Sequence, residues 1–282
     1  MEPMNGPLVS RPPMPFRGNK SKWIKYLFSF FKDNKLNLNK QTIIIDLFGG
    51  SGLLSILFKQ LYPDNTVIFN DYDNYLGVLK EVDKIDDLRA KLYSYLSDTD
   101  HQEPFSGTKV NHVFDLIKHS GLNVENPKIL GIISSWLMQI SGRQLTFKYK
   151  TLYNHVPVNP YKPKVIEYLQ HFKDIKVIHQ DYKAVINYFK TLKNVFYILD
   201  PPYLQSTKDF YKDTNQWSAN NLLEIIDLAL KHKSILFEST RSKPIILKYI
   251  KQKHKPNLKI NISHDKQFST SEDSDYFILF NV

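Results

Sequence analysis

A run of β-branched residues that ends in a cluster of glycines constrains the fold of this chain most strongly. Residues Thr42–Phe48 have the composition of a buried strand, and the tight turn Gly49–Gly52 follows at once. The apolar stretch Leu53–Leu61 predicts a helix that stops before Pro63, and Thr66–Asp71 predicts the next strand. A strand, a glycine turn, a helix and a second strand within about 30 residues make a βαβ unit.

The same alternation returns in the second half of the chain. Further strands are predicted at 176–179, 194–199, 234–237 and 276–280, with helices at 183–189 and 218–232. An amphipathic helix from Lys20 to Phe31 is predicted before the first strand, because apolar residues recur there at helical spacing. Elements that alternate in this way predict an α/β fold with a doubly wound, mostly parallel, Rossmann-like sheet.

The middle of the chain, between about 85 and 175, lacks this alternation. It has a mainly helical pattern and a loop-like tract at 153–163 that holds three prolines. We therefore expect two domains: residues 1–84 together with 176–282 form the sheet domain, and residues 85–175 form an inserted helical lobe.

Composition removes several classes of protein. The 282 residues include no cysteine, which excludes disulfides, thiolate metal sites and cysteine nucleophiles. The nine histidines show no metal-ligand spacing, and His101-Gln102-Glu103 lacks the two cysteines that a zinc deaminase would need. We expect no metal and no membrane partner, since no apolar run approaches the ~18 residues of a membrane span. The expected location is the cytoplasm of a bacterial or phage-infected cell.

The chain carries a net charge of +10 and has a pI near 9.3. A basic surplus of this size favours a polyanionic partner, because Lys and Arg displace counterions from phosphates. A Lys-rich proteome of an AT-rich genome explains the same surplus equally well. Charge alone therefore leaves both interpretations open.

The glycine turn and the acidic residues near it indicate a nucleoside cofactor. Glycines between a strand and a helix let the backbone approach a ligand closely. The turn from Asp46 to Gly52 is not the G-x-G-x-x-G of dinucleotide-binding proteins, since Ser55 occupies the last position. About 20 residues on, Asp71 ends the next predicted strand, where a carboxylate can accept hydrogen bonds from ribose hydroxyls.

Asp200-Pro201-Pro202-Tyr203 follows the predicted strand 194–199. Two prolines cannot continue a strand ladder, so the groups around them are exposed at its end. An exocyclic amine of a nucleobase is a poor nucleophile, because its lone pair is delocalised into the ring. The carboxylate of Asp200 and the carbonyl of Pro201 can accept its N–H bonds and direct the lone pair at a methyl sulfonium. Tyr203 offers a face for stacking an extruded base.

These motifs, in this order, resemble the Dam-type DNA adenine methyltransferases, the D12 class. The resemblance covers about residues 15–80 and 175–282. It is carried by Phe16 and Lys20, the segment Asp46–Gly52, Asp71, the pair Asp181-Tyr182 and the segment Asp200–Tyr203. It implies that S-adenosylmethionine donates a methyl group to adenine N6 in double-stranded DNA, with Asp200, Pro201, Pro202 and Tyr203 as the catalytic residues.

The resemblance also implies roles in cofactor binding. Phe16 would pack on the cofactor, and Lys20 would lie near its methionine carboxylate. The segment from Asp46 through Phe48, Gly50 and Gly52 would hold the methionine moiety. Asp71 would bind the ribose, and Asp181 or Tyr182 the adenine of the cofactor.

The inserted lobe would read DNA, together with Arg17 before the first helix. Arg143, Gln144 and Lys148 are the candidates within it, because Arg pairs with guanine and Gln with adenine at about 1–3 kcal/mol each. A solvated basic face explains these residues equally well. The family's Lys before the opening aromatic residue is Pro15 here, so a GATC target is not assumed. A cognate restriction endonuclease stays open as a partner.

Three alternatives remain at this point. Cytosine N4 poses the same electronic problem as adenine N6, and only the resemblance favours adenine. Methylation of protein glutamine or of RNA uses similar motifs, although the insert and the basic charge favour DNA. A binding protein that kept the fold without the reaction is the third alternative.

Overall fold

The computed structural model describes residues 7–16, 18–33, 36, 38–97, 107–137, 156–204, 217–253, 259–262 and 275–281. The chain divides into two compact units. We call the first the sheet unit (Met1–Arg11, Lys20–Asp73 and Asp174–Val282) and the second the helical unit (Pro12–Asn19 and Asn74–Lys173).

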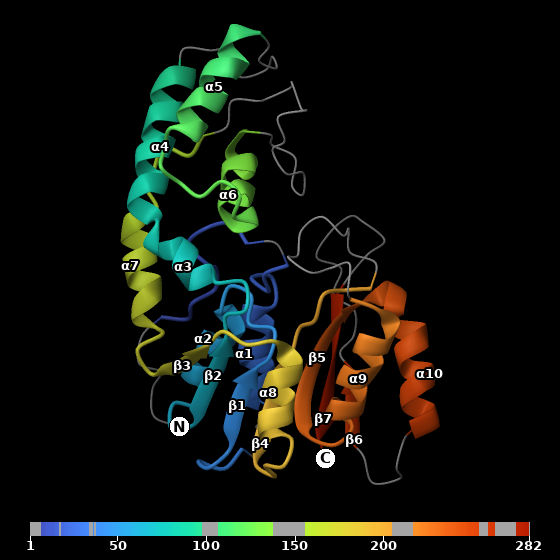
Figure 1. Ribbon diagram of the computed structural model, residues 1–282. Coiled ribbons are helices and arrows are strands. Elements are labelled where there is room, and N and C mark those ends of the chain that lie inside the picture. Colours follow the sequence, from blue (N-terminus) through green and yellow to red (C-terminus); the bar gives the residue numbers. More distant parts are fainter. Residues whose placement is uncertain are drawn as a thin grey trace. The chain divides into compact units, whose positions relative to one another are not determined.

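The sheet unit is built on a seven-stranded sheet of order β3-β2-β1-β4-β5-β7-β6 (Figure 1). From β3 to β5 every neighbouring pair is parallel, while β7 runs antiparallel to both β5 and β6. The mostly parallel α/β sheet predicted from the sequence is thus confirmed. The strands are β1 (Ile43–Asp46), β2 (Thr66–Asn70), β3 (Ile175–Ile178), β4 (Val195–Leu199), β5 (Lys233–Ser239), β6 (Lys259–Ile262) and β7 (Asp275–Asn281).

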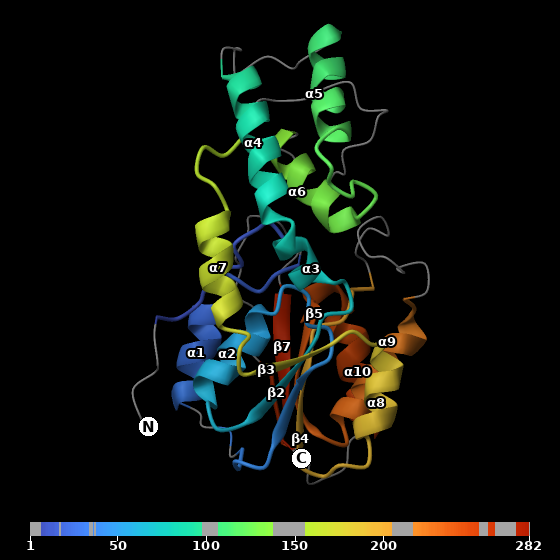
Figure 2. The ribbon, with the colours of Figure 1, turned by 60° about the vertical axis from the view of Figure 1, so that its left-hand side comes forward.

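Helices cover both faces of this sheet, as Figure 2 shows. On one face lie α1 (Ile24–Asp33) and α2 (Leu53–Leu61), and on the other α8 (Tyr182–Phe189), α9 (Ala219–Ala229) and α10 (Lys243–Lys253). Successive side chains of each strand point to opposite faces of the sheet, so each strand contributes to both core layers. In β4, Phe196 packs on Phe58 of α2, whereas Tyr197 joins the core under α9 and α10. This is the doubly wound arrangement.

An aromatic layer anchors α1 to the strands β5 and β7. Trp23, at the start of this helix, packs edge-on against Phe237 and Phe277, with ring centroids 6.3 and 5.7 Å apart. Because all three side chains are buried, the segment that carries Lys20 is held firmly above the end of β5.

The helical unit contains α3 (Tyr75–Lys80), α4 (Val82–Leu96), α5 (Thr108–Lys118), α6 (Pro127–Leu137) and α7 (Lys162–Gln170). A polar cluster around the buried Arg89 joins α4 to the start of α7. Asp86 accepts hydrogen bonds from the backbone amides of Tyr161 and Lys162, and Arg89 donates to the carbonyl of Pro157 at 2.7 Å. Arg89 and Asp86 also form an ion pair at 3.4 Å.

Neither a membrane-spanning helix nor a metal-binding group is found in the part of the chain that the structure describes. No helix there combines the length and the apolar composition that crossing a membrane requires. The same residues contain no group of three acidic or histidine side chains that could hold a metal ion.

Candidate functional site

Four acidic side chains lie at the carboxyl ends of four neighbouring parallel strands in the sheet unit. Asp46 ends β1, Asp71 follows β2, Asp200 follows β4, and Glu238 lies near the end of β5. Asp46, Asp71 and Glu238 are fully buried. The carboxyl ends of parallel strands meet at one edge, which is where open α/β sheets bind their ligands. The first three of these residues were predicted from the sequence, and Glu238 was not.

Asp200 is held by a buried lysine. The ammonium of Lys20 lies 2.6 Å from Oδ2 of Asp200, and the side chains of the two residues are 4% and 15% exposed. The same ammonium lies 5.4 Å from the ring centroid of Tyr203 and 5.7 Å from that of Phe237. Lys20, which precedes α1, and Asp200, which follows β4, therefore form one group with an aromatic lining.

This contact differs from the role that the resemblance gave to Lys20. We expected Lys20 near the methionine carboxylate of the cofactor, and its ammonium here binds the carboxylate of Asp200. Nothing in the pairing prevents a second anion from sharing the ammonium, which has three donors. The cofactor role of Lys20 stays a prediction.

Burial perturbs the titration of three carboxyl groups in this cluster. Burial raises the pKa of Asp200 to about 6, although the charge of Lys20 lowers it. Burial raises the pKa of Asp46 to about 7, against a hydrogen bond from Ser55 that lowers it. The pKa of Glu238 rises to about 8 for the same main reason. Carboxyl groups that titrate near neutrality in one cluster are typical of sites that bind ligands or move protons.

The turn after β1 brings the backbone close to β2. A Cβ on Gly49 would lie 2.1 Å from the ring of Phe69, so no larger residue fits. Gly50 and Gly52 have φ of 55° and 81°, in the left-handed region that glycine adopts without strain. The sequence predicted this turn, and its close approach explains why glycines occupy it.

Ser55 has a role that the sequence analysis did not foresee. Its hydroxyl donates a 2.7 Å hydrogen bond to Oδ2 of Asp46. A glycine at this position, as in the dinucleotide motif, could not make that bond. Oδ1 of Asp46 is buried and has no hydrogen-bond partner among the residues that the structure describes. An acceptor oriented but unsatisfied at the end of β1 fits a ligand with a positively charged donor.

Three aromatic side chains gather beside the glycine turn. The ring centroid of Phe48 lies 5.3 Å from that of Tyr182 and 5.6 Å from that of Trp217, and Tyr182 and Trp217 are also 5.6 Å apart. The amide of Asn221 donates to the hydroxyl of Tyr182 at 2.8 Å. Trp217 was not predicted, since no motif surrounds it, and its indole N–H has no acceptor within the described part of the chain.

The remaining residues that the sequence predicted for the cofactor and for DNA lie in different parts of the chain. Asp181 is exposed and caps α8 by accepting a hydrogen bond from the amide of Lys183. Phe16 belongs to the helical unit, where its ring meets Tyr75 and lies 3.9 Å below the ammonium of Lys128. The DNA-binding candidates Arg17, Arg143, Gln144 and Lys148 lie outside the described residues.

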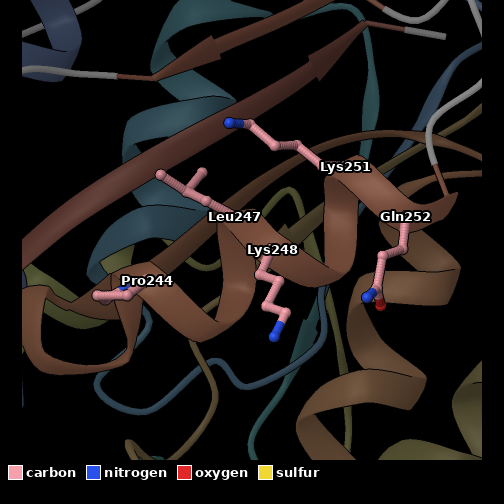
Figure 3. A pocket seen from close by; sticks show the side chains of 5 residues that line it. All are labelled: Pro244, Leu247, Lys248, Lys251 and Gln252. Atoms are coloured by element: carbon pink, nitrogen blue, oxygen red, sulfur yellow. The ribbon is translucent and has the colours of Figure 1, made fainter.

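A surface hollow of about 380 Å³ lies on α10, lined by Pro244, Leu247, Lys248, Lys251 and Gln252 (Figure 3). All five residues come from one helix, and none belongs to the carboxyl ends of the strands. The hollow therefore has no part in the site described above.

The residue pattern of this chain matches a known family model. Residues 16–253 match the D12 class N6 adenine-specific DNA methyltransferase. The chain belongs to this family. The match begins at Phe16 and includes the Lys20–Asp200 pair, the glycine turn, the whole helical unit after Asn74 and the end of β5.

The chain is also similar to individual proteins. A protein of Haemophilus influenzae (strain ATCC 51907 / DSM 11121 / KW20 / Rd), named "Putative methyltransferase", is 31% identical over 250 residues, which cover 87% of this chain and 81% of the relative. Among solved structures, a "putative methyltransferase" from Streptococcus mutans in complex with SAH aligns over 97% of this chain and 99% of its own, at 11% identity and a TM-score of 0.42.

The precorrin-6y C5,15-methyltransferase from Geobacter metallireducens GS-15 aligns over 98% of this chain and 99% of its own, at 10% identity and the same TM-score of 0.42. At these values neither structure bears on the substrate. Membership of the D12 family makes this protein a methyltransferase, with S-adenosylmethionine as the methyl donor.

Proposed function

We propose that this methyltransferase transfers the methyl group to N6 of adenine in double-stranded DNA. The observation that carries the proposal is the buried pair of Lys20 and Asp200 directly before Pro201, Pro202 and Tyr203. The pair supplies a charged hydrogen-bond acceptor at the end of β4. The two prolines that follow have no backbone N–H, so they add no hydrogen-bond donor there. An amine is the substrate group that such an acceptor-rich end can bind.

The proposed chemistry assigns each group one task. When bound, S-adenosylmethionine supplies an electrophilic methyl group. Asp200 and the carbonyl of Pro201 accept the two N–H bonds of the adenine amine, which draws the nitrogen toward tetrahedral geometry and frees its lone pair. As the N–C bond forms and the bond from the methyl group to sulfur breaks, one N–H bond of the amine also breaks and Asp200 takes the proton. A carboxylate whose pKa is about 6 holds a proton far better than an ordinary aspartate, so burial assists this step.

Lys20 counteracts the effect of burial on the pKa of Asp200. Without a nearby cation, a carboxylate this deeply buried would be protonated at neutral pH and could not accept an N–H bond. The ammonium of Lys20 at 2.6 Å favours the ionised form. Tyr203, whose ring faces the ammonium, would stack on the extruded base.

Cofactor binding is proposed at the turn after β1. Oδ1 of Asp46 would accept the ammonium group of the methionine moiety, since it is buried, oriented by Ser55 and unsatisfied within the described residues. Phe48, Gly50 and Gly52 would line this part of the pocket. Asp71 would bind the ribose and Tyr182 the adenine, while Phe16, Lys20 and Asp181 stay candidates.

The DNA contacts rest on charge and on the family. A net charge of +10 supports binding to a phosphate backbone. The helical unit is the proposed target-recognition domain, and Arg17, Arg143, Gln144 and Lys148 stay its candidate contacts. We expect DNA affinity to fall steeply with salt concentration. An affinity that did not change with salt would contradict a role for these cations on the phosphates.

The test is product analysis of DNA incubated with purified protein and labelled S-adenosylmethionine. The duplex is digested to nucleosides, which are identified by mass spectrometry, and N6-methyladenine is the expected product. Protein with Asp200→Ala, purified in parallel, shows whether a contaminating enzyme made the product. N4-methylcytosine as the sole product would replace adenine by cytosine, and DNA binding without any transfer would contradict the enzymatic proposal.

A further inference from the structure

The end of β5 contains a carboxyl group that the proposed mechanism does not use. Glu238 is fully buried and pairs in register with Tyr276 of β7. Its Oε1 accepts a 2.8 Å hydrogen bond from the amide of Ser239, while its Oε2 has no partner in the described part of the chain. A buried ionised carboxylate with one oxygen unsatisfied would be costly, so this geometry favours the uncharged acid.

Two of the three surrounding charges also favour the uncharged acid, because Asp200 and Asp275 raise the pKa of Glu238 while Lys20 lowers it. Asp200, Lys20 and Asp275 all act on Glu238 electrostatically, and they come from the end of β4, the segment before α1 and the start of β7. On the α10 side, Lys243 directs its ammonium to the ring of Tyr276, with 5.1 Å to the centroid. Asp46 completes the group, because it interacts with both Asp200 and Lys20.

Lys20 cannot neutralise three carboxylates. It contacts Asp200 directly at 2.6 Å, and Asp46 has the hydroxyl of Ser55 to support it. Glu238 has only the neighbouring amide of Ser239 as a hydrogen-bond partner in the described residues. Of the three, Glu238 is therefore the group that keeps its proton at neutral pH, in agreement with a pKa of about 8.

We propose that Glu238 is a positioning residue of the methyl-transfer site, which as an uncharged acid leaves the ammonium of Lys20 to Asp200 alone. Ionisation of Glu238 adds a second negative charge beside Asp200 and competes for Lys20. The ammonium of Lys20 is then drawn from Asp200 toward Glu238, and the carboxylate of Asp200 is no longer held where it accepts the substrate's N–H bond. The end of β5 thus sets an alkaline limit to the reaction. This inference rests on the proposed function of Asp200.

The experiment compares kcat at pH 7 and pH 9 in the wild type, Glu238→Gln and Glu224→Gln. At pH 9 a group with a pKa of about 8 is about 90% ionised, so we expect the wild-type kcat to fall about tenfold. Glu238→Gln keeps the shape and the acceptor for Ser239 but cannot ionise, and its ratio of the two rates should stay near 1. Glu224, which is exposed on α9, is the matched carboxylate and should show the wild-type ratio. A tenfold fall in Glu238→Gln would overturn the proposal.

A second measurement needs no substrate. The carboxyl carbon of Glu238 in isotopically labelled wild-type protein can be titrated by NMR, with Glu238→Gln used only to assign the signal or, if it does not fold, with selective labelling. A midpoint between pH 7 and 9 supports the proposal, and a midpoint below pH 6 overturns it. Because this titration uses no DNA, it separates a wrong charge state of Glu238 from a wrong substrate.

Discussion

Each of the two units contains a buried ion pair, and the two pairs have different surroundings. The carboxylates Asp200 and Asp86 are equally exposed, at 15% of their side chains. Asp86 accepts backbone amides on both oxygens, and its partner Arg89 donates to backbone carbonyls. Asp200 instead shares its surroundings with two further buried carboxyl groups, Asp46 and Glu238, and its pKa is raised.

The hydrogen bonds that surround an ion pair therefore distinguish a structural pair from a functional one. A pair whose hydrogen-bonding capacity is filled by the backbone fixes one chain segment to another. A pair beside unsatisfied acceptors has capacity left for a ligand. Burial alone does not distinguish the two cases, because Lys20–Asp200 and Arg89–Asp86 are similar in burial.

The largest expected effect separates the two carboxylates directly. Asp200→Ala should lower the rate of methyl transfer by about 10³-fold or more, while the affinity for S-adenosylmethionine changes little. Asp86→Ala should destabilise the protein by about 3 kcal/mol, because Arg89 and two amides lose their partner. Single-turnover kinetics, calorimetric titration of the cofactor and urea unfolding measure these effects. Loss of cofactor binding in Asp200→Ala would mean that its role is misassigned.

The next largest effect on the rate is expected from removing the charge of Lys20. Lys20→Met should raise the pKa of Asp200 above 6, because burial then acts without the opposing charge. The rate at pH 7 should fall by about 10- to 100-fold and recover in part as the pH rises. A pH–rate profile measures the shift of the acid limb. A rate that is low at every pH would instead indicate that Lys20 acts on the cofactor or on DNA.

A smaller effect is expected at the glycine turn. Gly49→Ala places a Cβ 2.1 Å from the ring of Phe69, so the turn must shift and the affinity for S-adenosylmethionine should fall by about tenfold. Gly131→Ala is the matched control, since its Cβ meets nothing within 4 Å and lies within α6. Calorimetric titration of both variants measures the difference. Equal affinities would show that the turn does not contact the cofactor.

The smallest effect is a pH dependence of stability. The unfolded chain releases the proton of Glu238 near pH 4.5, and the folded chain only near pH 8. The free energy of unfolding should therefore fall as the pH rises through this window. Glu238→Gln should reduce that fall, whereas Asp86→Asn should not. Urea unfolding at pH 5, 7 and 9 measures the slopes, and equal slopes in wild type and Glu238→Gln would contradict the raised pKa.

Much of the sheet unit could be predicted because its signals are local. The β-branched run before Gly49 and the apolar stretch 53–61 gave β1 and α2 to within two residues at each end. By contrast, β6 and α10 were not predicted. β6 pairs only with β7 at the edge of the sheet, so little apolar pattern identifies it. In α10, lysines separate the apolar residues, and Pro244 in the first turn resembles a helix breaker, so its amphipathic spacing is hard to recognise.

The site was predicted in part for a similar reason. Asp46, Asp71 and Asp200 each follow an apolar strand, a position that the sequence displays. Their partners come from tertiary structure: the contact of Lys20 with Asp200 spans 180 positions of the chain, and no pattern within either motif encodes it. Glu238 is the instructive omission. An acidic residue within the apolar strand Lys233–Ser239 was a visible signal, because charge is not buried without a reason.

The path of the chain through the sheet has a consequence for how the proposed target-recognition unit is attached. The chain leaves the sheet after β2 and re-enters at β3, which is hydrogen-bonded to β2 itself. Asn70 joins the two ends, since its amide donates to the carbonyl of Gln180 and its carbonyl accepts the amide of Gln180. The segment between these ends leaves and re-enters the sheet at one junction, so we expect a change in its length or sequence to leave the strands that carry Asp46 and Asp200 with the same neighbours.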